Sequence, residues 1–553
     1  VKHKDIPALD LLALILGQGD SSRLVKKLRI EKAVVNSIGS SLFSAQDQGL
    51  FVISMGYNKE NLSEALDGAK DCIQKIITGE ISDEELKKAI TNIESEQFYA
   101  SETVDGLARQ VGQSEFLMNR PDYLKKYLSQ ICKVTEMELK QIAKKYLAPS
   151  TMTLACLTND KKAAVRKKLE KWTATYSKDF SKYKISKTIK PKMKLGKTWT
   201  TSLNSNKSEL KIIPLKSGVR VLLRKTEDTH MVCARAAFLG GARAEDLFQE
   251  GAVELLGRSW TGGTENLSET EIYHTIESIA SGLNPVCGKN SVGLSLESLV
   301  PFESVAADLF VEVLGRPIFP DEIVEREKLV QLEQIKTRKD NPAQMCSREF
   351  MKKLFKNHPL GKDMLGTEES LKIISSKNLV TLWKGLAQKK NLTVIVAGNI
   401  KEDLWLKKLE SGLEKLPEGQ KFSKSWPVEA LNQDEISFVE LKKEQSHLIC
   451  GFHGLSLMDP EKYALHVIQS ILAGMGGRLF IELREKNSLA YSVSPLSQEG
   501  LEKGYFGAYI GCSPDKVQKA LEMMKIEFNK LCDKKVSDLE LSRAKKYIVG
   551  RHD

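Results

Sequence analysis

Histidine and cysteine are the side chains that most often hold zinc in proteins, and this sequence contains eight histidines and nine cysteines. Two histidines at positions i and i+4 share a helix face and can converge on one tetrahedral ion. None of the histidines has another four residues away, and the cysteines are odd in number without any C-x-x-C spacing. The spacing therefore indicates neither a zinc cluster nor a disulfide framework, and unpaired thiols favour a reducing compartment.

Two other patterns resemble binding motifs when taken alone. His447 and His453, in SHLICGFHG, lie on an apolar strand pattern without a carboxylate cluster, which favours hydrogen-bonded sheet histidines over metal ligands. Gly474, Gly476 and Gly477 suggest a phosphate-cradling loop, but no G-K-[ST] follows them. We interpret them as glycines at the entry to a helix.

The segment with these glycines occurs twice. GDSSRLVKKLR at 19–29 matches GMGGRLFIELR at 474–484, an offset of 455 residues. The same offset, without a gap, aligns ISDEELKKA with VSDLELSRA, and each of these carries an S-x-x-E capping box, at Ser82 and at Ser537. Such a box marks the start of a helix. Two copies of one domain explain the match.

A further domain lies between the two copies. It begins with the strand pair LKIIPL and VRVLL around Gly218 and closes with NLTVIVAGNI at 391–400. The closing strand resembles TMTLACLTND, which predicts a strand at Thr151–Leu157 in the first copy. Short apolar strands mixed with helices predict an α+β fold in each unit. The expected organisation is a domain at 1–160, a Lys-rich linker at 161–208, a domain at 209–415 and a domain at 416–553.

The net charge of +11 is concentrated in one stretch. Between Lys161 and Lys197 there are 14 Lys or Arg residues and two acids, Glu170 and Asp179, so the rest of the chain is close to neutral. We interpret the stretch as a solvated linker that its like charges keep extended, and the alternative is an arm that binds polyanions. We expect no nucleic acid as a partner, because the rest of the chain is close to neutral. We also expect no membrane as a partner, since no apolar run reaches the length of a membrane span.

Three motifs together resemble the pitrilysin (insulinase) family of zinc peptidases. They are GARAED at 241–246, EGAVELLGRSWTGGT at 250–264 and GMGGRLFIELREKNSLAYSV at 474–493. The resemblance implies repeated α/β domains, each a mixed and mostly antiparallel sheet with helices on one face, arranged as parts of two clamshell halves. It also implies that the chain begins inside the family's second domain and contains the third and most of the fourth.

The family's first domain carries an H-x-x-E-H motif, in which two histidines hold zinc and the glutamate is a general base. The similar segment here places Glu254, Gly257 and Arg258 at the motif positions, and LVQLEQIKTRKDNP places Gln334 at the third ligand. The resemblance thus implies a degenerate zinc site and no metal in this chain. Glu254 and Arg258 are expected to form an i, i+4 ion pair worth about 0.3 to 0.5 kcal/mol.

The resemblance also places Arg484 and Tyr491 where the family's fourth domain carries the Arg and Tyr that reach the substrate. A guanidinium offers a fork of donors to a peptide, and a phenol can donate a hydrogen bond to an oxyanion. The first copy has Arg29 and Asn36 at these positions. The alternative is that Arg484 is a surface residue paired with a neighbouring glutamate and that Tyr491 is half-buried.

The resemblance implies that the parent protein is a zinc metalloendopeptidase that encloses and hydrolyses peptides, which bind as an added strand on a sheet edge. The zinc and a first domain of the same polypeptide would then be partners of this chain, and the chain alone is expected to be inactive. The alternative function is that of a non-catalytic structural or peptide-holding subunit. The sequence does not name the compartment or the peptides.

Overall fold

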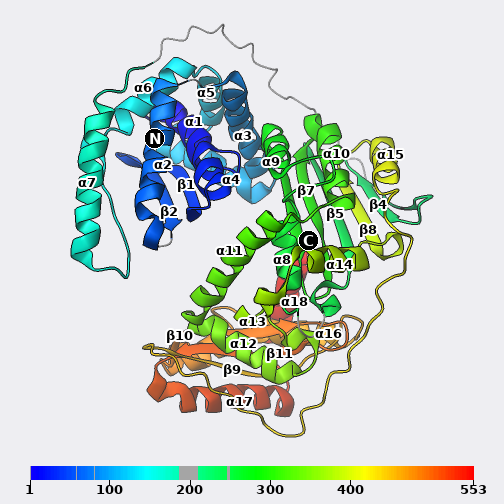
Figure 1. Ribbon diagram of the computed structural model, residues 1–553. Helices are drawn as coiled ribbons and strands as arrows, with labels where there is room; N and C mark the ends of the chain where they lie inside the picture. Colours follow the sequence, from blue (N-terminus) through cyan, green and yellow to red (C-terminus); the bar gives the residue numbers. More distant parts are fainter. Residues whose placement is uncertain (1, 58, 80, 186–208, 246–248, 553) are drawn as a thin grey trace.

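The computed structural model describes residues 2–57, 59–79, 81–185, 209–245 and 249–552. They form three α/β units, which we call the first unit (2–185), the middle unit (209–416) and the last unit (446–552) (Figure 1). Each unit has its own buried apolar cluster, and the largest of them lies in the middle unit. This confirms the predicted mixture of antiparallel and mixed sheets with packed helices.

The first unit has a two-stranded antiparallel sheet, in which Phe51 pairs with Leu42. Its strands are β1 Val35–Ser44 and β2 Gly49–Tyr57, and its helices are α1 Ile6–Gly17, a π-helix at Val25–Glu31, α2 Leu62–Thr78, α3 Asp83–Ser101, α4 Val104–Met118, α5 Tyr123–Ile131, α6 Glu136–Tyr146 and α7 Lys162–Phe180. The apolar sides of α1, α2, α3 and α6 form the core.

The predicted extended linker is wrong for Lys162–Phe180, which forms helix α7. Trp172, Tyr176 and Phe180 follow one another every four residues, and their ring centroids lie 5.2 and 5.6 Å apart. Tyr176 is 1% exposed and Phe180 9%. This aromatic stripe packs α7 on the first unit, while most of its lysines lie on the opposite, exposed face. The remainder of the linker, 186–208, lies outside the described residues.

The predicted strand at Thr151–Leu157 is also wrong. A short turn at Pro149–Thr151 precedes Met152–Leu157, which is not a strand, and Leu157 is 100% exposed. A strand requires a neighbour that accepts its backbone hydrogen bonds. Among the residues that the structure describes, no strand pairs with Met152–Leu157.

The middle unit has a six-stranded sheet in the order β3-β4-β8-β5-β7-β6, in which only β4 and β8 are parallel. The strands are β3 Leu210–Pro214, β4 Arg220–Lys225, β5 Met231–Leu239, β6 Gly282–Cys287, β7 Ser291–Leu299 and β8 Leu392–Gly398. The helices are α8 Ala252–Ser259, α9 Glu269–Ser278, α10 Glu303–Gly315, α11 Asp321–Lys339, α12 Pro342–Phe355, α13 Glu368–Ile373, α14 Ser376–Leu386 and α15 Glu402–Gly412.

The last unit has a three-stranded antiparallel sheet in the order β10-β11-β9. Its elements are β9 Ser446–His453, α16 Lys462–Leu472, a π-helix at Phe480–Lys486, β10 Ala490–Gln498, β11 Tyr505–Cys512, α17 Val517–Asp533 and α18 Asp538–His552. Helices α12 and α17 lie on opposite sides of this sheet (Figure 1). The middle unit therefore contributes a helix to the outer face of the last one.

The two sequence copies adopt the same local structure. Adding 455 to the bounds of the first π-helix gives those of the second, and π-helices are rare. Arg23 makes two hydrogen bonds of 2.8 and 2.9 Å to Glu85, as Arg478 does at 2.8 and 3.0 Å to Glu540. Both predicted capping boxes form. The domain repeat is thus confirmed.

The GARAED turn joins the middle unit to the last one. Arg243, 3% exposed, donates a hydrogen bond of 2.8 Å to Glu502 and stacks on the Trp426 ring at 4.6 Å. Burial alone would raise the pKa of Glu502, but the hydrogen bonds and charge of Arg243 outweigh it and lower the pKa to about 2. The pair is one of the contacts that join the last unit to the middle one.

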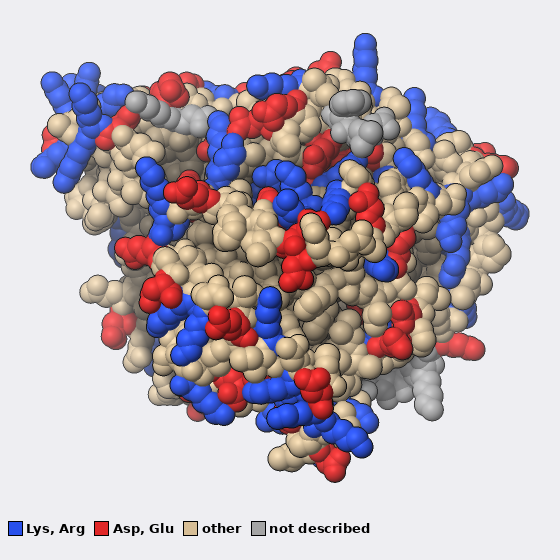
Figure 2. Space-filling model, turned by 90° about the horizontal axis from the view of Figure 1, so that it is seen from below, with Lys and Arg blue, Asp and Glu red and all other residues tan. Residues whose placement is uncertain are grey.

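Acidic and basic side chains are interspersed over much of the face that Figure 2 presents. Among the helices that the structure describes, none has both the length and the apolar character to cross a bilayer. The charge that dominates the sequence is local to α7 and the residues after it.

Candidate functional site

The degenerate metal position lies between α8 and α11 of the middle unit. Arg258 lies 2.9 Å from the Glu254 carboxylate, which confirms the predicted i, i+4 ion pair. A second N–H of Arg258 donates to the Gln334 side chain at 2.6 Å. The structure therefore brings together three of the four residues at the motif positions, around a guanidinium.

Gly257 completes the motif positions but has no room for a side chain. A Cβ atom there would lie 2.6 Å from the Cys287 Sγ on β6. Burial raises the pKa of the Cys287 thiol to about 12, so it is a neutral packing group. Cys287 of β6 therefore occupies the space that a side chain at position 257 would need. The sequence analysis did not predict this contact.

A metal does not fit this position, because a guanidinium is always cationic and is never a ligand. Within the described residues, no group of three or more His, Cys, Asp or Glu side chains is placed to hold an ion. Beside this position the buried Gln331 donates hydrogen bonds to the carbonyls of Gly251 and Leu365 at 3.1 and 2.9 Å. The residues that the resemblance assigns to the zinc motif therefore form an ion pair and a hydrogen bond.

Arg484 and Tyr491 lie together at the exposed end of the last unit's π-helix. The Arg484 guanidinium carbon is 4.6 Å from the Phe480 ring and 4.7 Å from the Tyr491 ring, and one N–H donates to the Tyr491 carbonyl at 2.9 Å. Tyr491 is 82% exposed, so the alternative in which it is half-buried is wrong. Arg484 Nε also lies 4.0 Å from a carboxylate oxygen of Glu485, so the long ion pair with a neighbouring glutamate is present as well.

The equivalent arginine of the first copy has a different partner. Arg29 forms an ion pair of 3.0 Å with Asp20, and Asp20 corresponds to Met475, which is 81% exposed in the last unit. Burial raises the pKa of Asp20, and Arg29 opposes the shift. The same π-helix therefore presents a neutralised arginine in one copy and an aromatic-stacked arginine in the other.

The glycines and histidines behave as the sequence indicates. Gly474, with φ of +76°, lies in the turn between α16 and the π-helix, as expected for helix-entry glycines. In β9, His447 bonds the Tyr509 hydroxyl at 2.7 Å and His453 bonds the Leu354 carbonyl at 2.8 Å. Both are hydrogen-bonded sheet histidines.

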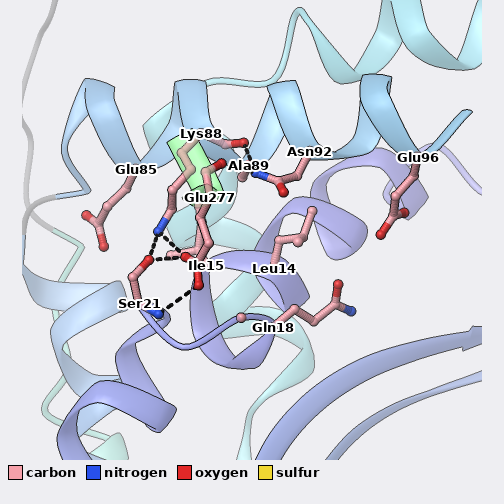
Figure 3. A pocket seen from close by; sticks show the side chains of 11 residues that line it. Leu14, Ile15, Gln18, Ser21, Glu85, Lys88, Ala89, Asn92, Glu96 and Glu277 are labelled. Atoms are coloured by element: carbon pink, nitrogen blue, oxygen red, sulfur yellow. Dashed lines mark hydrogen bonds and ion pairs between the residues drawn. The ribbon is translucent and has the colours of Figure 1, made fainter. Parts of the chain in front are cut away.

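A polar contact that sequence reasoning missed joins the first unit to the middle one. Glu277 of α9 accepts from the Ser21 backbone at 2.9 Å and pairs with Lys88 at 3.0 Å, while Asn92 donates to its carbonyl at 2.7 Å (Figure 3). A cavity of about 160 Å³ lies beside them and extends toward Glu96. The contact is made by residues more than 180 positions apart, so no local pattern could reveal it.

Two descriptions of one protein family match the chain. "Peptidase M16 inactive domain" matches residues 1–93 and 374–548, and "Insulinase (Peptidase family M16)" matches residues 220–368. The second range contains Glu254, Gly257, Arg258 and Gln334. The four residues that the sequence analysis assigned to a degenerate zinc motif therefore lie in the part of the chain that matches the insulinase description.

Curated relatives have similar descriptions. An "uncharacterized zinc protease" of Rickettsia felis is 27% identical over 341 residues, which are 61% of this chain and 82% of that protein. A "non-peptidase homolog" of Helicobacter pylori is 25% identical over 316 residues, 57% of this chain and 73% of that protein. The relatives thus include proteins described as peptidases and one described as not.

Two solved structures share the fold. A peptidase M16 inactive domain from Pseudomonas fluorescens has a TM-score of 0.59 at 24% identity and covers 62% of this chain and 84% of that chain. The periplasmic protease PqqL of Escherichia coli has a TM-score of 0.55 at 15% identity and covers 99% of this chain and 62% of that chain. The chain belongs to the peptidase M16 (insulinase) family.

Proposed function

We propose that this chain is the peptide-gripping part of a zinc metalloendopeptidase and that a separate zinc-bearing unit completes the chamber. One observation carries the proposal: Arg484 and Tyr491 are stacked together, and Tyr491 is exposed. A peptide is held between this surface and the zinc-bearing unit. The zinc ion, when bound there, activates the water that attacks the peptide bond.

The two side chains have separate roles in this proposal. The Tyr491 hydroxyl donates to the oxyanion that develops on the attacked carbonyl. Arg484 uses one N–H on the Tyr491 carbonyl, and a guanidinium has five N–H groups, so others serve to orient the peptide. Phe480 stacks against the guanidinium and restricts its position.

The outer face of the β1–β2 sheet is the proposed docking surface for the zinc-bearing unit. In the last unit this face is covered by α12, where Phe350 packs edge-on against Tyr505 at 6.1 Å. Residue 50 corresponds to residue 505 at the repeat offset. In the first unit Leu50 is 65% exposed, and Phe43 on the adjoining strand is 64% exposed. A unit built like residues 209–416, with its own α12-like helix, fits this face.

Substitution of the phenol tests the proposal. In the enzyme assembled with its zinc-bearing unit, Tyr491→Phe is expected to lower kcat by about 10²-fold, as for the loss of one oxyanion donor. Because Tyr491 is 82% exposed, thermal unfolding should be unchanged. Unchanged turnover would remove Tyr491 from the mechanism.

A second candidate is a non-catalytic, peptide-holding subunit. Arg258 at the metal position of the middle unit favours it, because this copy has already lost the metal chemistry. The sequence of the unit that docks on β1–β2 discriminates the two candidates. An H-x-x-E-H motif there and hydrolysis that chelators abolish support the peptidase, whereas peptide binding that is indifferent to chelators supports the holding subunit.

A further inference from the structure

The π-helix arginine of the first unit binds a carboxylate. Arg29 Nη1 lies 3.0 Å from Oδ1 of Asp20, which stands nine positions earlier, in the turn that leads into the helix. About a third of each side chain is exposed, 33% for Arg29 and 34% for Asp20. A guanidinium in contact with a carboxylate makes a charge-assisted hydrogen bond, which is stronger than one between neutral groups. The first unit therefore shows one ligand that this guanidinium accepts.

The last unit has Met475 where the first unit has Asp20. The turns that hold these two residues have the same backbone pattern, since Gly19 and Gly474 just before them have φ angles of +86° and +76°. Both turns also lead into π-helices whose bounds differ by the repeat offset. Position 475 therefore has the same relation to the arginine of its π-helix as position 20 has, but its side chain carries no carboxylate.

The Arg484 guanidinium keeps donors for a carboxylate. Its side chain is 34% exposed, close to the 33% of Arg29. The rings of Phe480 and Tyr491 lie 4.6 and 4.7 Å from its central carbon and restrict how it can turn. One N–H donates to the Tyr491 carbonyl at 2.9 Å. Because a guanidinium has five N–H groups, others remain for a bidentate contact with a carboxylate.

The charges near this guanidinium favour an anionic ligand. The ion pair between Glu482 and Lys486, at 2.8 Å, is neutral as a whole. Glu485 is 60% exposed and lies 4.0 Å from Arg484 Nε, so water weakens this contact. Arg543 of α18 is a second cation, and it donates a hydrogen bond of 2.7 Å to the backbone carbonyl at position 476, one residue after position 475. These three cations and two acids leave a positive excess.

Apolar groups lie around this cation. Met475 is 81% exposed and Tyr491 82% exposed, and Phe480 is half-buried. The thioether of methionine is flexible and adapts to apolar partners of different shape, and an exposed aromatic ring offers a flat apolar face. A peptide whose carboxylate reaches Arg484 therefore brings the side chain next to that carboxylate onto these groups.

We propose that Arg484 binds a carboxylate of the peptide at the place that Asp20 has in the first unit, and that an apolar residue next to this carboxylate lies on Met475. The proposal rests on the proposed function, in which this surface grips the peptide, and it names the substrate class. The carboxylate is either the free C-terminus of the peptide or an acidic side chain, since both present the same group to the guanidinium. In either case the ligand replaces a carboxylate that the first unit supplies from its own chain.

Isothermal titration calorimetry on the full chain separates the two sources. The N-acetylated peptide Ser-Gly-Ser-Gln-Leu is compared with a free C-terminus and with a C-terminal amide, and Ser-Gly-Ser-Glu-Leu is added with a C-terminal amide. We expect at least one of the two peptides that carry a carboxylate to bind about tenfold or more tightly than the uncharged peptide, because hydrogen bonds to charged groups are the stronger ones. The tighter of the two identifies the source. Equal dissociation constants for all three peptides overturn the proposal.

A matched pair of variants places the carboxylate on the molecule. Met475→Asp installs the residue of the first unit, so its own carboxylate should occupy Arg484, repel a second carboxylate and abolish the preference for the charged peptide. Met475→Asn has the same size without the charge and should retain the preference. Position 475 is 81% exposed, so both variants should unfold at the temperature of the parent. Equal preferences in the two variants, or a preference that survives Arg484→Gln, contradict the proposal.

The outcome is separable from that of the proposed function. The preference is a ratio of dissociation constants that requires neither zinc nor hydrolysis, so it is measured on this chain alone. If the chain prefers a carboxylate peptide but Tyr491→Phe leaves turnover unchanged, the carboxylate site stands and the mechanism fails. If the chain has no preference while Tyr491→Phe lowers turnover, the mechanism stands and the proposed substrate class fails.

Discussion

The first and last units carry a π-helix at equivalent repeat positions, yet the equivalent arginines, Arg29 and Arg484, have different partners. Arg29 is neutralised by Asp20, whereas Arg484 is stacked between Phe480 and Tyr491. The scaffold interactions are the same in both, down to the Arg23–Glu85 and Arg478–Glu540 pairs. Under the proposed function, a few side chains around a shared π-helix decide whether a copy has a structural or a peptide-binding role.

The largest expected effect comes from converting the last unit into the first. Met475→Asp with Tyr491→Asn installs the residues that the first copy has at positions 20 and 36. The new carboxylate should pair with Arg484, and the phenol is lost. We expect kcat/KM of the assembled enzyme to fall by at least about 10²-fold, measured with a fluorogenic peptide.

Both substituted side chains are more than 80% exposed, so the conversion should leave the unfolding temperature within a degree or two of the parent. Full activity in the doubly substituted enzyme would mean that the difference between the copies has no catalytic meaning.

A smaller effect concerns the element that the two copies share. Hydrogen bonds from Arg478 lower the pKa of Glu540 to about 2, and burial opposes this. Burial raises the pKa of Glu85, but its hydrogen bonds and the charge of Arg23 outweigh it, so that this pKa is also lowered. A carboxyl group whose pKa is lowered in the folded state stabilises the protein at pH values above its unfolded pKa. This stabilisation is lost as the pH falls through the folded pKa.

The difference in unfolding temperature between the parent and Glu540→Gln should therefore shrink from about pH 5 to pH 3. These pairs are partly exposed, so each is worth at most about 1 kcal/mol. Glu85→Gln should behave in the same direction. Opposite pH trends for the two variants would show that the copies are less alike than their geometry indicates.

Much of the fold followed from local sequence patterns. The repeat, both capping boxes and strands β3, β4 and β8 were predicted from local sequence patterns, because each depends on neighbours in the sequence. The Glu254–Arg258 pair followed for the same reason, since residues four apart on a helix are adjacent.

Each of the two wrong predictions has its own physical cause. Thr151–Leu157 has strand composition, but its strand character requires a neighbour that the described chain does not place beside it. In α7 the abundant lysines concealed an aromatic stripe, and burial of that stripe outweighs the repulsion between exposed charges.

The contacts of the site that could not be predicted join residues that are far apart in the sequence. The hydrogen bond from Arg258 to Gln334 spans 76 positions, and the contact between Gly257 and Cys287 depends on how α8 crosses the sheet. The stacking of Arg484 between two rings requires the π-helix, whose extra residue per turn has no sequence signature here.

One pair of substitutions tests the central claim most directly: kcat/KM of the assembled zinc enzyme for Arg484→Ala and for Arg29→Ala. Loss of charge-assisted hydrogen bonds to the peptide should make Arg484→Ala about 10- to 100-fold less active. Arg29→Ala removes only a partly exposed ion pair and should retain activity within about twofold. Equal losses in the two variants, or none in either, would contradict the assignment of peptide binding to the last unit.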